Sequence, residues 1–136
     1  MTIDANGTFE VKVNVQKADN QEAESAKLGR MSLEKRFHGE LQATSAGEML
    51  SVGTEIAGSA GYVAMERVNG TLHGRTGSFA LQHSGTMKRG EPQLSVTVVP
   101  DSGTGKLCGL SGSMHIRIEP GGKHFYDFDY QILETP

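Results

Sequence analysis

Two ionisable side chains, Arg75 and His83, stand near the two ends of a segment that alternates like a β-strand, GRTGSFALQHSG at residues 74–85. Alternate residues of an extended chain point to the same side, so Phe79 and Leu81 share the face of both charged groups. Such a face either lines a cavity that holds something polar or belongs to an ordinary core strand with charges at its ends. In the first case a guanidinium and an imidazole could orient an amphipathic acid or transfer a proton.

A second strand is expected to bring more polar groups to this face. The segment MERVNGTLHGR contains Asn69 and Gly70, the two-residue signal of a type I′ hairpin turn. A turn at this position pairs Glu66 with His73 and extends the shared face along both strands. If the face is exterior, its charged residues form a solvated cluster that adds little stability. If it is interior, the candidate ligand-binding residues, including two from the closing aromatic strand, are Tyr62, Glu66, Arg75, Phe79, Leu81, His83, Tyr126 and Tyr130.

Each candidate also has a purely structural interpretation. His83 could be a strand-end histidine bonded to a neighbour, and Glu66 and Arg75 could pair only to cancel their charges. Core packing explains Tyr126 and Tyr130 as readily as ligand stacking does. Which face of residues 71–84 points inward depends on bulges that the sequence does not place, so no catalytic residue is assigned.

The elements that must position these residues are strands. Apolar residues recur at every second position, and 18 glycines supply turns between the runs. The clearest runs are TFEVKVNV (8–15), QLSVTVV (93–99), SMHIRIE (113–119) and YDFDYQI (126–132), each with its apolar set expected to face a core. Residues 16–27 lack the pattern and are predicted to be a polar surface excursion. About eight strands without a linker predict one all-β domain over residues 1–136, a closed antiparallel barrel or a sandwich.

Composition excludes several classes of protein. The 136 residues carry 13 Lys and Arg against 16 Asp and Glu, and a formal charge of −3 offers no footprint for nucleic acid. The single cysteine, Cys108, predicts a buried, reduced thiol and a cytoplasmic location. No secretory signal or membrane-spanning apolar stretch is visible, so no membrane partner is expected.

The residue spacings in this sequence do not match those of familiar catalytic and metal-binding motifs. PDSGTGK has Pro100 where a phosphate-binding loop needs glycine and Leu107 where it needs Ser or Thr, which favours a plain turn. The five histidines have no short metal-ligand spacing, so neither a metal nor a cofactor is expected. Ser84 directly follows His83, so the two side chains point to opposite faces and cannot act as nucleophile and base.

The order of motifs resembles a known family. HGEL with TSAG, GYVAMERVNGTLHGRTGSFALQHSG, SGTGKLCGLSGSMHIRI and FYDFDYQI together resemble the bacterial DUF3224 family, whose function is unknown, from about residue 8 to residue 133. A weaker resemblance extends to allene oxide cyclases and dirigent proteins. The resemblance implies an eight-stranded allene oxide cyclase-like barrel with a cavity and a tendency to form a homodimer or homotrimer, and it implies no established activity.

The catalytic groups of the cyclases are mostly missing from the resembling positions. Lys12 falls where that family carries a catalytic glutamate, Leu33 where it has a cavity proline, and Met49 where it has a cavity cysteine. An ammonium in place of a carboxylate inverts the charge near the substrate, which argues against the same mechanism. Whether the chain is an enzyme stays open.

Three functions from different classes are left. The first is a carrier or sensor of a small apolar or amphipathic ligand, oriented by Glu66, Arg75 and His83. The second is an isomerase or cyclase in which His83 or Glu66 acts as acid or base on a small unsaturated substrate. The third is a structural, self-associating module whose cavity is filled by its own side chains.

Overall fold

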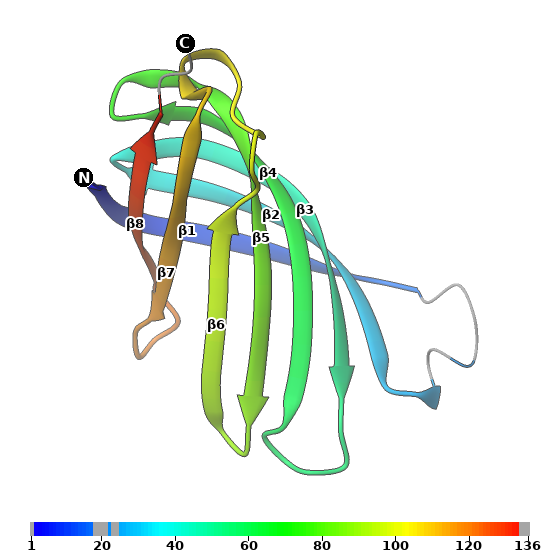
Figure 1. Cartoon of the computed structure of the whole chain (residues 1–136). Coiled ribbons are helices and arrows are strands. Elements are labelled where there is room, and N and C mark those ends of the chain that lie inside the picture. Colours follow the sequence, from blue (N-terminus) through cyan, green and yellow to red (C-terminus); the bar gives the residue numbers. More distant parts are fainter. Residues whose placement is uncertain (1, 18–21, 23–24, 134–136) are drawn as a thin grey trace.

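The computed structural model describes residues 2–17, 22 and 25–133. Eight antiparallel strands follow one another around a closed barrel in chain order, and β1 pairs with β8 (Figure 1). The strands are β1 Ile3–Gln16, β2 Leu28–Gly39, β3 Leu41–Gly53, β4 Ala60–Leu72, β5 Arg75–Lys88, β6 Glu91–Val98, β7 Leu110–Ile118 and β8 His124–Ile132. A single 3-10 turn, η1 Gly105–Leu107, precedes β7. The expected all-β closed barrel is confirmed.

The two ends of the barrel differ. The connections β3–β4, β5–β6 and β7–β8 lie together at the lower end in Figure 1, which we call the mouth. The turns β2–β3 and β4–β5 and the longer β6–β7 segment lie at the opposite, closed end. The register between β6 and β7 contains one pair, Thr97 with Ser113, whereas every other pair of neighbouring strands shares seven or more.

The β4–β5 hairpin turns four residues later than the sequence predicts. His73 and Gly74 have φ of 46° and 79°, the positive values that a type I′ turn needs at both central residues. Gly70 stays in the strand, because β3 passes so close that a Cβ at this position would lie 2.6 Å from the Cβ of Ala43. The predicted pairing of Glu66 with His73 is therefore wrong, and Glu66 pairs with Leu81.

The hydrophobic core fills the closed half of the barrel. Its fully buried members come from every side of the interior, and Leu107 of η1 covers the end. Phe79 and Phe128 stack with their ring centres 5.8 Å apart across the barrel. Side chains rather than solvent therefore occupy this half.

Apolar residues at the mouth are exposed although they continue the inward-facing rows. Val15 is 82% exposed and Ile118 is 63% exposed. The expectation that every apolar set faces a packed core is thus wrong for the last residues of these strands. Alternation identifies the inward face but not where the filling of the barrel ends.

The segment that links β6 to β7 is a turn, as the failed phosphate-loop spacing predicted. Thr104 holds it against β5, since its backbone N–H donates to the Ser78 carbonyl over 2.8 Å. Cys108 follows η1 and is exposed, which contradicts the expectation of a buried thiol. Within the predicted surface excursion at residues 16–27, residues 18–21 and 23–24 lie outside the described part of the chain.

Candidate functional site

Three ionisable side chains from three strands meet inside the barrel. The Lys35 Nζ of β2 donates to Glu66 Oε2 of β4 over 2.7 Å, and His83 Nε2 of β5 lies 2.7 Å from the same oxygen. Lys35 is 8% exposed, Glu66 2% and His83 3%. We call these three residues the ionic cluster. A buried ion pair with a shared acceptor is costly to desolvate, so its position in the interior calls for a reason beyond stability.

Small residues on β3 allow the cluster to form. Strand β3 separates Lys35 from Glu66, and its inward residues at the crossing are Ser45 and Gly47. A Cβ at Gly47 would lie 2.7 Å from the Cβ of Glu66, closer than real side chains approach. The absence of that Cβ lets the carboxylate of β4 and the ammonium of β2 meet above β3.

The surroundings keep Glu66 charged. Burial acts to raise the pKa of Glu66, but the His83 hydrogen bond and the charge and hydrogen bond of Lys35 outweigh it, and the pKa falls to about 2. The Lys35 ammonium also lies 5.1 Å from the centre of the Phe9 ring and 5.9 Å from that of Phe37. Both rings are close enough to stabilise the ammonium by a cation–π contact.

The cluster leaves hydrogen-bonding capacity unused. Glu66 Oε1 and Ser45 Oγ are buried without a partner among the described residues. Because a carboxylate only accepts hydrogen bonds, the Nε2 of His83 must carry the hydrogen that it shares with Glu66. Buried polar atoms are normally paired, so the unpaired Glu66 Oε1 calls for a donor that the described residues do not supply.

An apolar cavity of about 400 Å³ opens at the mouth. Its inward-facing lining includes Met49, Ser51, Tyr62, Gly85, Leu94 and Ile118. Gly85 makes room for Tyr62, since a Cβ there would lie 2.4 Å from the tyrosine ring. The volume falls within the range of small-molecule sites.

Tyr62 connects the cavity to the ionic cluster. It lines the cavity, and its ring centre is 6.4 Å from that of His83. Burial raises the pKa of Tyr62, and the negative charge of Glu66 raises it further. Ala64 is the one inward residue between Tyr62 and Glu66 on β4. Its small side chain does not screen Tyr62 from the charge of Glu66.

The structure brings together only some of the predicted site residues. Tyr62, Glu66 and His83 lie as one group between the mouth and the core. Arg75 is exposed at the closed end, so the expected pairing of Glu66 with Arg75 is wrong. The sequence interpretation missed Lys35, although LEKRF offers the signal: Lys35 sits between Leu33 and Phe37 in an alternating inward row.

The remaining candidates are packed into the core. Phe79 and Leu81 are at most 1% exposed. The Tyr126 hydroxyl accepts from the Leu41 backbone N–H over 2.9 Å and donates to the His38 carbonyl over 2.8 Å. The Tyr130 hydroxyl lies 2.6 Å from His73 Nδ1. All four therefore shape the closed half and lie away from the cavity.

The rest of the described chain shows no competing site of the usual kinds. Within residues 2–17, 22 and 25–133, no group of three or more His, Cys, Asp or Glu side chains is arranged to hold a metal ion. The same residues form no helix of the length and apolarity that a membrane crossing requires. A hollow over β1–β5 is lined mainly by polar and charged residues of both signs, among them Lys12, Glu34 and Arg67, and it also reaches the inward residues Lys35 and Ser45.

Barrel, cavity and ionic cluster define a class: a small closed antiparallel barrel with an apolar cavity at one end and a buried ionic cluster in its interior. The DUF3224 family, described as proteins of unknown function, matches residues 5–130, and the chain belongs to this family. A crystal structure of a DUF3224 protein of unknown function from Shewanella oneidensis MR-1 is similar to it. That protein is 48% identical with a TM-score of 0.91, covering 98% of this chain and all of the other. No curated protein matches the chain.

Proposed function

We propose that the chain binds a small amphipathic molecule in the mouth of the barrel. The apolar body of the ligand occupies the cavity, and its polar end meets Tyr62, His83 and Glu66. The observation that carries this proposal is Tyr62, which lines an apolar cavity of about 400 Å³ and has its ring centre 6.4 Å from that of His83, the partner of a carboxylate whose buried Oε1 is unpaired. Apolar pockets with a few convergent polar groups are the usual form of small-molecule sites.

The test blocks the cavity with one side chain. Ser51 points into the cavity and its neighbour Val52 points outward, so Ser51→Phe fills the mouth while Val52→Phe adds the same group outside. Native mass spectrometry of gently purified protein should show a retained small molecule on the wild type and on Val52→Phe, and none on Ser51→Phe. Equal retention by all three proteins would place the ligand elsewhere.

A second candidate function is isomerisation or cyclisation of a small unsaturated substrate. The bond from His83 to Glu66 favours it, because a carboxylate that orients an imidazole is a recurrent arrangement for a general base. The other ring nitrogen of His83, Nδ1, would then take and return the proton. His83→Gln should abolish turnover of a bound substrate without abolishing its retention, and turnover that survives this substitution rules His83 out as the base.

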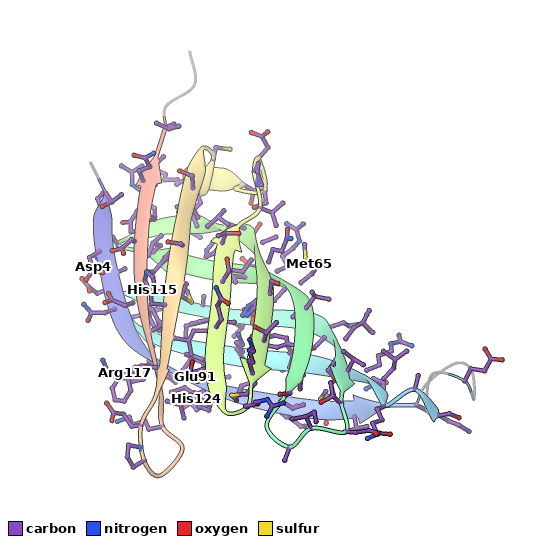
Figure 2. All side chains as sticks on the ribbon, turned by 60° about the horizontal axis from the view of Figure 1, so that its bottom comes forward. Asp4, Met65, Glu91, His115, Arg117 and His124 are labelled. Carbon is purple, nitrogen blue, oxygen red and sulfur yellow. The ribbon has the colours of Figure 1, made fainter. Side chains whose placement is uncertain are left out.

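Self-association as a homodimer or homotrimer and a cytoplasmic location stay predictions. Leu50, Val63 and Met65 support self-association, since these neighbours on β3 and β4 are each more than half exposed on the outer face. Met65 projects away from the barrel in Figure 2. The native mass spectrum reads the oligomeric mass together with the ligand.

A further inference from the structure

We propose that the polar end of the ligand is a neutral hydroxyl group, as in an alcohol or phenol, which donates to Glu66. This inference rests on the proposed function, because it concerns the same cavity. The sequence interpretation pointed instead to an amphipathic acid, and the arrangement of charges in the interior is the reason for the change.

The site lacks a free cation for an acid. Arg75, which the acid hypothesis required, is exposed at the closed end. Lys35, the buried cation, already bonds Glu66 over 2.7 Å and lies over the Phe9 and Phe37 rings. A carboxylate entering from the mouth would therefore meet the Glu66 charge without a cation of its own, and burying an unpaired charge is strongly unfavourable.

A ligand with an ammonium group is also unfavourable. It could pair with the Glu66 carboxylate, but that carboxylate is already paired with the Lys35 ammonium. Two cations beside one buried carboxylate leave a net positive charge in a low-dielectric interior. Lys35 and Glu66 already pair with each other over 2.7 Å, so neither charge is left over for a charged group of the ligand, and a neutral donor fits better.

A hydroxyl matches the unused acceptor. Glu66 Oε1 is buried without a partner among the described residues. A hydroxyl hydrogen donated to a carboxylate forms a short, charge-assisted bond. An ether of the same length offers only an acceptor, so it cannot satisfy Glu66 Oε1.

The experiment compares four probes with one alkyl chain: 1-octanol, octanoate, octylamine and octyl methyl ether. Affinity is measured by titration calorimetry at pH 7 and checked by intrinsic tyrosine fluorescence, since Tyr62 lines the cavity. We expect 1-octanol to bind about tenfold more tightly than each of the other three, the factor for one hydrogen bond to a charged group. Octanoate or the ether binding as tightly as 1-octanol overturns the hydroxyl inference and leaves the proposed function standing, whereas binding of no probe overturns both.

Two variants connect the preference to Glu66. In Glu66→Met the acceptor is gone, and 1-octanol should bind no better than the ether. Because that variant leaves Lys35 unpaired and could unfold, Lys35→Met/Glu66→Met provides the same test without a buried charge. Glu48→Met is the matched control, since the Glu48 side chain is 63% exposed on the outer face. A tenfold preference for 1-octanol that persists in the double variant contradicts the role of Glu66.

Discussion

The pairing of Lys35 with Glu66 predicts that the same substitution changes the free energy of unfolding in opposite directions in two backgrounds. We expect Lys35→Met to destabilise the wild-type protein and to stabilise the Glu66→Met variant. In the first background the substitution removes a partner of a buried carboxylate, and in the second it removes a buried ammonium that has lost its partner.

The geometry sets the magnitudes. Charges 2.7 Å apart attract by about 6 kcal/mol at an effective dielectric constant of about 20, and desolvation offsets much of this. Glu66→Met leaves the Lys35 ammonium buried without a partner, which lowers the free energy of unfolding by about 3–5 kcal/mol. It also removes the acceptor of His83, which lowers it by a further amount of about 1–3 kcal/mol. The double variant carries only the second cost, so the free energy of unfolding should recover by about 3 kcal/mol.

Lys35→Met alone should cost less than Glu66→Met. His83 still donates to the Glu66 carboxylate in that variant, and an apolar methionine side chain replaces the ammonium that lies 5.1 Å from the Phe9 ring centre. We therefore expect a loss of about 1–3 kcal/mol.

The assay is urea unfolding at pH 7, followed by circular dichroism and tyrosine fluorescence with linear extrapolation. If Glu66→Met is already unfolded in water, the double variant should be folded, which reports the same sign. The exposed pair of Arg30 with Glu48, 3.1 Å apart, serves as the control and should show a coupling below about 1 kcal/mol. If Lys35→Met destabilises both backgrounds equally, the two residues do not act as a buried pair.

Three further predictions concern the same interior. Gly47→Ala should destabilise the protein by more than about 1 kcal/mol in urea unfolding, because its Cβ would meet Glu66, while Gly61→Ala, whose Cβ has ordinary contacts, should not. The pKa of Glu66 is about 2 in the folded state against its ordinary 4.5, so the unfolded chain binds the proton first as pH falls. Wild-type unfolding free energy should therefore fall by about 3 kcal/mol relative to the double variant between pH 4.5 and pH 2, and parallel pH profiles would refute this. Tyr126→Phe leaves the buried Leu41 N–H without an acceptor and should lower the free energy of urea unfolding by about 1–3 kcal/mol. Tyr62 lines the open cavity, so Tyr62→Phe should lower it by less.

The sequence predicts the fold and the inward face of β5 for a simple physical reason. Side chains alternate with a period of two, so moving the hairpin turn from Asn69–Gly70 to His73–Gly74, a shift of four residues, leaves His83 on the inner face. The turn was misplaced because Gly70 is needed for the close approach of β3, a constraint between strands that a local turn signal does not contain.

The candidate site is harder to predict from the sequence than the fold. Its members come from β2, β4 and β5, and Lys35 reaches Glu66 only because β3 carries small residues at the crossing. That coincidence depends on how the barrel rolls up, which alternation within one strand does not determine. The exposure of Val15 at the mouth likewise depends on where the core ends.

The single residue pair between β6 and β7 gives the cavity an adjustable wall. Leu94 on β6 and Ile118 on β7 both line the cavity, and the two strands run apart toward the mouth (Figure 1). Separating β6 from β7 breaks far fewer backbone hydrogen bonds than separating any other neighbouring pair of strands. Widening the barrel between these two strands therefore requires the least free energy. The cavity can therefore change width without moving β2, β4 and β5, the strands that carry Lys35, Glu66 and His83.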